Sequence, residues 1–161
     1  MDIRNMNKYY VYVFPPLFYL CVALAGKAFT SQGIGSWYQT IAKPTYTPPG
    51  SLIGAAWTII FILSTVSLIL FLKHGQGRPR FRLIISLYIC NGLLNAAWSY
   101  LFFTKHLLGL AVIDAGLIAI TVLLIILWSW HYSRLAAALL IPYFGWVSFA
   151  TYLTYVIFKM N

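Results

Sequence analysis

The side chains of this chain that could do chemistry are mainly aromatic. The 161 residues include only two acids, so a pair of carboxylates for general acid–base catalysis is not expected. The three histidines, His74, His106 and His131, fall in connections between apolar segments and make a poor metal site, so no metal is predicted. No Ser/His/Asp or Cys/His set is recognisable, nor is a phosphate-binding glycine loop. Any enzymatic activity would therefore come from tryptophan chemistry or from a bound chromophore, which leaves enzyme status open.

Aromatic rings and prolines concentrate in the stretch from Trp37 to Trp57. Its three prolines fix φ and remove backbone donors, so a regular helix is not expected across this stretch. A connection this long in a compact protein is usually functional, and we predict that segment 30–50 is a lid. An interfacial anchor that binds no ligand is the alternative. The candidate ligand-binding residues of the lid are Trp37, Tyr38, Lys43, Pro44 and Tyr46.

The composition predicts an all-α integral membrane protein. Hydrophobic residues make up 61% of the chain and charged residues 8%, whereas a soluble domain carries about 25% charged residues. Five apolar stretches approach the roughly 20 residues that cross a bilayer as a helix. We therefore predict a single domain over residues 1–161, a five-helix bundle with an uncleaved first helix and a capping loop between helices one and two. The predicted helices span residues 9–29, 51–72, 83–103, 107–130 and 135–158.

The basic residues predict the orientation rather than a nucleic-acid partner, because they lie at segment ends and in loops, where they contact lipid headgroups. The side of the membrane that holds the N-terminus carries more basic residues than the lid side, which favours the N-terminus in the cytoplasm and the lid outside. A bacterial cytoplasmic membrane is preferred, with a mitochondrial outer membrane as the alternative. The first side holds Arg4, Lys8, Lys73, Arg78, Arg80, Arg82 and Arg134, and the other holds Lys27, Lys43, Lys105 and Lys159.

Distance from a segment end predicts depth, because a helix rises about 1.5 Å per residue. By this rule, polar and aromatic residues from four helices converge on one layer beneath the lid, where we predict a cavity. A carboxylate in hydrocarbon must face the interior and be paired, so Asp114 is a candidate for ligand contact. The alternative is that Asp114 and the asparagines Asn91 and Asn95 simply join neighbouring helices. The converging residues are Trp57, Asn95, Trp98, Asp114, Trp146 and Tyr152.

Small residues recur on two helix faces and would let helices approach closely. They are Ala111, Ala115 and Ala119 in the fourth segment, and Gly92 and Ala96 in the third. Spacing alone does not tell whether these faces pack the monomer or form a dimer. The two cysteines, Cys21 and Cys90, lie within apolar segments and are expected to be packed thiols rather than a disulfide.

The motifs in this chain closely resemble those of the TspO family, the tryptophan-rich sensory proteins also called translocator protein or peripheral-type benzodiazepine receptor. The likeness covers the whole chain in the right order. It rests on Trp37-Tyr38, Lys43-Pro44, Tyr46, Pro48-Pro49, Ala56-Trp57-Thr58, Asn95-Ala96-Ala97-Trp98, Phe102-Phe103, Asp114, Ile141-Pro142-Tyr143-Phe144-Gly145-Trp146 and Ala150-Thr151-Tyr152-Leu153. Two positions depart from the pattern: Tyr46 stands where many members have tryptophan, and Phe61 where many have tyrosine.

The resemblance implies a five-helix bundle, often a homodimer, that binds porphyrins such as protoporphyrin IX or haem as ligands, without an intrinsic cofactor. It also implies sterol or drug binding, and light- and oxygen-dependent porphyrin breakdown through Trp57 and Trp146. Tyr143 joins the ligand-binding residues on the same basis. We therefore expect a porphyrin receptor or sensor, and the alternative is a transporter of porphyrin, sterol or lipid.

The C-terminal run Leu153, Tyr155 and Lys159 fits a proposed cholesterol pattern of an aliphatic residue, a tyrosine and a base. It also falls where the family's cholesterol segment lies. The alternative is that Lys159, at a helix end, is a snorkelling anchor.

Overall fold

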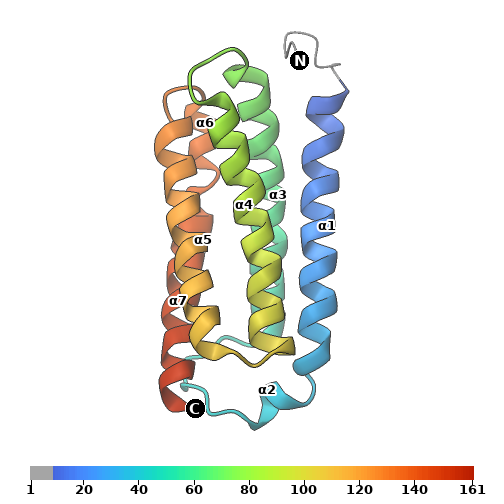
Figure 1. The fold of residues 1–161 in the computed structure, drawn as a ribbon, viewed down its shortest axis with the longest axis vertical. Coiled ribbons are helices and arrows are strands. Elements are labelled where there is room, and N and C mark those ends of the chain that lie inside the picture. The colour runs from blue at the N-terminus through green and yellow to red at the C-terminus, as the bar shows by residue number, and fades with distance from the viewer. Residues whose placement is uncertain (1–8) are drawn as a thin grey trace.

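The computed structural model describes residues 9–161, and over that range its regular secondary structure is helical (Figure 1). Five helices are long and apolar enough to cross a membrane, which makes the chain a five-helix integral membrane protein. The first three are α1 (Tyr10–Gly33), α3 (Gly50–Gly75), and α4 (Phe81–Ser99) continued by the π-helix η2 (Tyr100–Thr104). The last two are α5 (Leu108–Ser129) and α7 (Ile141–Met160), the latter preceded by the short α6 (Arg134–Ala138).

The predicted helix boundaries are close to the observed ones, and the largest difference is at the lid. Helix α1 runs through Pro15 and Pro16 and on to Gly33, so the connection to α3 is shorter than the predicted 30–50. Part of that connection is itself helical, because Trp37–Thr40 forms the single turn α2. Regular helix was not expected there. The prolines that exclude helix all come later, at Pro44, Pro48 and Pro49, which leaves the first turn free to form.

The helices do not pack evenly along their length. Helix α5 packs against α4 and α7, while α1 packs against α3 and α4. Every buried residue of α3 lies between Ile60 and Gly75, and none of its first ten residues is buried. Since α3 starts at the lid, its lid-side half is loosely packed and its opposite half lies within the main core.

The small residues pack the monomer. Ala111 and Ala115 are almost completely buried within this one chain. A side chain at position 92 would collide with the Phe18 ring, so Gly92 lets α4 and α1 approach closely. These faces therefore carry no information about a dimer, which remains a prediction. The prediction for the cysteines is wrong in part: Cys21 and Cys90 are free, as expected, but both are exposed rather than packed.

The turn from α4 into α5 is shaped by the π-helix η2. The Lys105 backbone N–H donates to the Tyr100 carbonyl at 2.9 Å, five residues back, which widens the last turn. Gly33 of α1 packs directly against the Phe103 carbonyl, and the Thr104 hydroxyl donates to the Phe29 carbonyl at 3.4 Å. The widened turn thus presents buried Phe102 and Phe103 at the lid end of the bundle.

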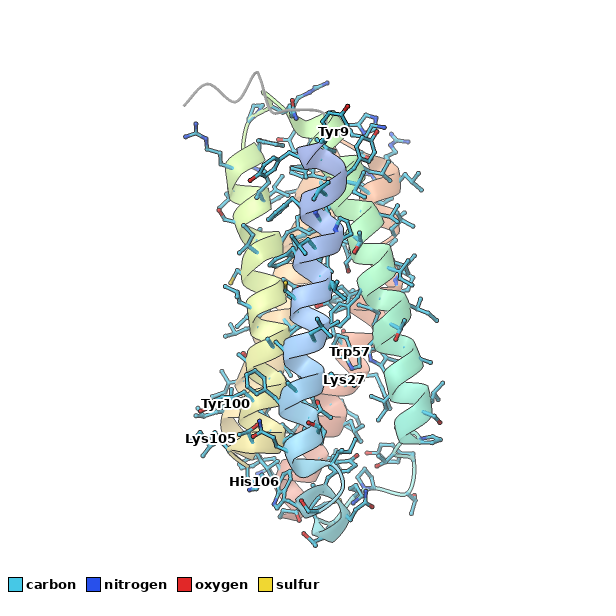
Figure 2. All side chains as sticks on the ribbon, turned by 90° about the vertical axis from the view of Figure 1, so that its right-hand side faces the viewer. Tyr9, Lys27, Trp57, Tyr100, Lys105 and His106 are labelled. Carbon is cyan, nitrogen blue, oxygen red and sulfur yellow. The ribbon has the colours of Figure 1, made fainter. Side chains whose placement is uncertain are left out.

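Most basic side chains lie at the two ends of the bundle, as the sequence predicts, but Lys27 lies within α1, well before its end at Gly33 (Figure 2). Figure 2 shows Tyr9 at one end, and Lys105 and His106 at the end that carries the lid. Arg4 and Lys8, which were assigned to the first end, lie outside the described residues. Within residues 9–161, that end carries Lys73, Arg78, Arg80, Arg82 and Arg134.

Candidate functional site

The first part of the lid is docked on η2 by aromatic contacts. The Trp37 ring stacks on His106 with centroids 4.0 Å apart and meets Phe102 edge-on at 5.5 Å. The neighbouring Tyr38 ring lies 5.5 Å from Phe103. Burial raises the pKa of the Tyr38 hydroxyl above its ordinary value. Trp37 and Tyr38, both predicted ligand-binding residues, therefore also hold the lid in place.

Lys43 is used by the lid itself. Its ammonium donates to the backbone carbonyls of Tyr38 and Ile41, the latter at 3.1 Å, and lies 4.6 Å from the Tyr38 ring centroid. These contacts satisfy carbonyls in a segment whose prolines leave few backbone donors. A ligand carboxylate that reached Lys43, one of the predicted ligand-binding residues, would have to compete with them.

A second attachment joins the lid to the C-terminal residue and was not foreseen from the sequence. The Ala42 backbone N–H donates to Asn161 Oδ1 at 2.9 Å, and Asn161 Nδ2 donates to the Ala42 carbonyl at 3.0 Å. One asparagine side chain thus pairs with both polar groups of one lid residue. An isolated asparagine at the end of an apolar helix gives no sequence signal for such a contact.

The remainder of the lid, Pro44 to Pro49, crosses toward α3 with fewer contacts. Thr47 closes a turn onto the Pro44 carbonyl, through its N–H at 3.0 Å and its hydroxyl at 2.7 Å. Tyr46 is exposed, and its ring lies nearly parallel to that of Tyr152 on α7 with centroids 6.4 Å apart. This part of the lid therefore lies over α7 and the start of α3.

Beneath the lid, a buried hydrogen-bond network joins α4, α5 and α7; we call it the floor network. The Tyr143 hydroxyl donates to Asn91 Oδ1 at 2.7 Å and accepts from Asn95 Nδ2 at 2.6 Å. Asn91 Nδ2 donates to the Ile118 carbonyl at 3.1 Å and to the Thr121 hydroxyl at 2.8 Å. Asn95 and Tyr143, both predicted to contact ligand, bond to each other here. The asparagines thus join neighbouring helices, which is the role that the sequence analysis gave as the alternative to ligand contact.

Three tryptophans lie on the lid side of this network; we call them the aromatic layer. Helices α4 and α7 both run toward the lid, so Trp98 and Trp146 each lie one turn beyond the bonded pair Asn95 and Tyr143. Trp57 of α3 completes the layer, with its ring edge-on to Tyr143 at 6.1 Å. All three rings are half-buried. The convergence that the depth rule predicted is therefore present for these residues.

Polar atoms without a hydrogen-bond partner lie in the aromatic layer and one turn below it. Among residues 9–161, four buried side-chain polar atoms lack a partner, and three of them are Trp98 Nε1, Trp146 Nε1 and Asp114 Oδ2. Asp114 is only 6% exposed. Buried polar groups normally find a partner, so unpaired groups call for an explanation. This level combines flat aromatic walls with polar atoms able to bind a ligand.

The residues of the predicted sterol run do not share one surface. Leu153 is buried beside Phe102 and Phe103, whereas Tyr155 and Lys159 are exposed. The Lys159 ammonium lies 5.8 Å from the Tyr155 ring centroid. A separate open groove of about 420 Å³ lies near the lid, and its lining includes none of these three residues; it is formed by His106, Leu107, Leu108, Gly109, Leu110, Phe158 and Asn161.

Fold and site together define a five-helix integral membrane protein with a tryptophan layer beneath a docked lid. The TspO/MBR family model matches residues 15–160, and the chain belongs to this family. It is 40% identical over 126 residues to the tryptophan-rich protein TspO of Bacillus cereus, covering 78% of this chain and 81% of that protein.

Two further relatives show how widely similar proteins occur. The tryptophan-rich protein TspO of Archaeoglobus fulgidus is 33% identical over 142 residues, covering 88% of this chain and 91% of that protein. The human translocator protein is 29% identical over 126 residues, covering 78% of this chain and 75% of that protein. The chain therefore aligns with most of the length of each of these relatives.

Proposed function

We propose that this protein is a membrane receptor or sensor that binds porphyrins, such as protoporphyrin IX or haem, between the aromatic layer and the lid. The observation that carries the proposal is the position of Trp57, Trp98 and Trp146. They come from three different helices and lie at one level above a rigid, hydrogen-bonded floor. A large flat macrocycle matches such walls, because aromatic faces stack and bury area without requiring many polar contacts.

We further propose that the bound porphyrin is degraded under light and dioxygen, with Trp57 and Trp146 as the redox-active side chains. Dioxygen is the oxidant and the porphyrin is oxidised, while the indoles pass electrons between them. The Trp57 ring packs against Tyr143 and Phe61, with ring centroids 6.1 and 5.7 Å apart. These contacts hold it in place within the layer. Trp146 contacts Phe149 at 5.8 Å. Fixed rings favour repeated reaction in one geometry.

The experiment that tests both parts is a dark fluorescence titration of detergent-purified protein with protoporphyrin IX, followed by illumination of the same sample in air. Saturable quenching of tryptophan and then a new absorbing product would support binding and degradation. Quenching without a product would leave a sensor or carrier. No saturable quenching would overturn the porphyrin proposal and bring lipid or sterol binding forward.

Transport of porphyrin, sterol or lipid is the second candidate function, and the packing of α3 supports it. The first ten residues of α3 are not buried, so this part of the helix is covered less by the rest of the bundle than its second half. A ligand that leaves sideways between α3 and α7 would reach the bilayer. Flux of porphyrin into sealed vesicles that contain the protein, absent from empty vesicles, would establish this function.

We place the protein in a bacterial cytoplasmic membrane with the N-terminus inside, as a homodimer. The support for the orientation is the basic end that includes Arg78, Arg80 and Arg82. Labelling of a Thr45→Cys variant by a membrane-impermeant maleimide on whole cells would support an outside lid. Labelling only after lysis would reverse the orientation.

A further inference from the structure

The contact that docks α2 on the bundle includes a ring that can gain a charge. The Trp37 indole and the His106 imidazole lie nearly parallel, with 16° between their planes and 4.0 Å between their ring centroids. The contact of Trp37 with Phe102 is looser, edge-on at 5.5 Å. Histidine is the side chain that ordinarily changes charge between about pH 5 and 8. The lid is therefore joined to the bundle through a ring that can take up a proton.

The position of His106 is set by the turn between η2 and α5. The Lys105 N–H donates to the Tyr100 carbonyl and the Leu107 N–H to the Leu101 carbonyl, both at 2.9 Å, so the residues on either side are bonded to η2. Between them, His106 has a φ of 58°, in the left-handed region that residues other than glycine seldom adopt. Such a conformation persists only where the surrounding structure holds it. The imidazole is thus a fixed platform on which the lid docks.

His106 is also open to water. It is exposed at the lid end of the bundle, so its imidazole can exchange protons with the solvent on that side (Figure 2). The face of an indole is negative, and it attracts a cation that lies over it. An imidazolium therefore binds the Trp37 face more tightly than a neutral imidazole does. At an exposed site this difference corresponds to about a two- to fivefold change in an equilibrium constant.

We propose that the stack of Trp37 on His106 is a pH-sensitive latch, which holds the lid more firmly when His106 is protonated. The sign follows from the contact itself: the imidazolium has the indole face as a partner while the lid is docked and loses that partner when the lid leaves. The proton therefore favours the docked lid. The added stability of docking is present at acidic pH and is lost as the pH rises and the imidazole gives up its proton.

The cations around His106 oppose this effect, because they repel an added positive charge. They are Lys27 on α1, Lys43 on the lid, Lys105 on the same turn and Lys159 on α7. Three of them are directed at other groups: Lys43 at carbonyls of the lid, and Lys105 and Lys159 at the rings of Tyr100 and Tyr155. Water and salt screen exposed charges that are not in contact. The stack, in contrast, is a direct contact.

The remaining charges near this turn are few or offset one another. His106 follows the C-terminal end of η2, which favours a cation, and precedes the N-terminal end of α5, which disfavours one. Asn161 lines the same groove as His106, and a terminal carboxylate on it would favour the protonated ring. Asp114 is buried within α5. The contact with Trp37 therefore decides the direction of the effect.

The test measures lid docking on the full-length protein in detergent, without any ligand. Hydrogen–deuterium exchange of the lid segment 36–42 is followed from pH 8 to pH 5, and each rate is divided by that of an unstructured peptide of the same sequence at the same pH. We expect protection of this segment to increase about two- to fivefold toward pH 5. Because no porphyrin is present, the outcome does not depend on the proposed function.

Four variants show whether His106 is responsible. His106→Phe keeps a ring for the stack but takes up no proton, so its lid protection should not follow pH. His106→Asn tolerates the left-handed backbone but removes the ring, and should lower protection at both ends of the pH range. Lys105→Gln removes a neighbouring cation and should move the transition to higher pH. His131→Phe, at the opposite end of the bundle, is the matched control and should behave as the wild type.

Three results would overturn the latch. The first is wild-type lid protection that stays constant between pH 8 and pH 5. The second is a lid that loosens toward pH 5, since the sign would then be wrong. The third is an unchanged pH dependence in both His106→Phe and His106→Asn, because another group would then carry the effect.

Discussion

The two halves of the bundle use similar residues for different purposes. In the half away from the lid, Ser67 bonds both to the Tyr88 hydroxyl at 2.7 Å and to the Ala136 carbonyl at 2.6 Å. Leu68 and Phe71 there are completely buried. In the lid half, the tryptophans are half-buried and three polar atoms have no partner.

This difference separates stability from binding. The distant half is closely packed, and its hydrogen bonds are mostly satisfied, with Ser64 Oγ as a buried atom that lacks a partner. We therefore expect it to contribute most of the free energy of folding. The lid half leaves aromatic area and polar groups free for a ligand. Substitutions in the two halves should therefore have different effects, which makes the comparison testable.

The largest effect is expected from Phe71→Ala in the distant half. The ring is fully buried and stacks on Phe81 at 5.5 Å, so its loss should lower the free energy of unfolding by about 3–5 kcal/mol. Denaturant or thermal unfolding in detergent measures this. Porphyrin affinity of the protein that remains folded should be close to wild type. A large loss of affinity in that folded fraction would mean that the two halves are coupled.

A smaller effect is expected from Tyr143→Phe, with Tyr88→Phe as its counterpart in the distant half. Each variant keeps the ring and leaves buried partners unpaired, which should cost about 1–3 kcal/mol of stability. Only Tyr143→Phe should also weaken porphyrin binding, because the floor network supports the aromatic layer. If Tyr88→Phe weakened binding equally, the floor network would have no special role.

Trp57→Phe and Trp146→Phe test the chemistry of the lid half. Phenylalanine is much harder to oxidise than tryptophan but preserves an aromatic wall. We expect the rate of porphyrin photodegradation to fall about tenfold, close to 1.4 kcal/mol of barrier, and binding to change less. The dark titration and the illumination rate on one sample separate these effects. Wild-type degradation rates in both variants would rule out the tryptophan mechanism.

The smallest effect is expected from Asn161→Ala, which removes both hydrogen bonds to Ala42 of the lid. The contact is exposed, so the melting temperature should hardly change. The dissociation rate of bound porphyrin should rise about threefold, as expected for the loss of about 0.6 kcal/mol. Ser148→Ala is the control, because that exposed hydroxyl of α7 bonds only to its own helix, at the Phe144 carbonyl. Stopped-flow displacement measures both.

Depth was predictable from the sequence, but the direction of individual side chains was not. The fixed rise of a helix predicted that Trp57, Trp98 and Trp146 lie beneath the lid, with Trp146 the deepest of the three, and all three pack against the main core there. Asn95 was placed beneath the lid too, whereas Tyr143 entered only through the family resemblance. Their bond to each other depends on how α4 and α7 rotate about their axes, which apolar segments of nearly uniform hydrophobicity do not specify.

Local competition for hydrogen bonds was also hidden in the sequence. Lys43 was a reasonable partner for a ligand carboxylate, but the carbonyls of its own loop are nearer. The π-helix η2 has no recognisable signal, because it depends on the fit of Phe102 and Phe103 against α1 and the lid. Such choices are made by tertiary packing after the helices have formed.

The lid connects α1 to α3, but more contacts hold it where it leaves α1 than where it enters α3, so its motion should concentrate near α3. Trp37 and Ala42 are held by contacts with His106 and Asn161, and the segment that follows is stiffened by prolines at positions 44, 48 and 49. A segment stiffened in this way should move as one unit and should not change its backbone conformation residue by residue. The aperture should therefore form beside α3 and α7, where Tyr46 lies over Tyr152, while the side over α1 and η2 stays shut.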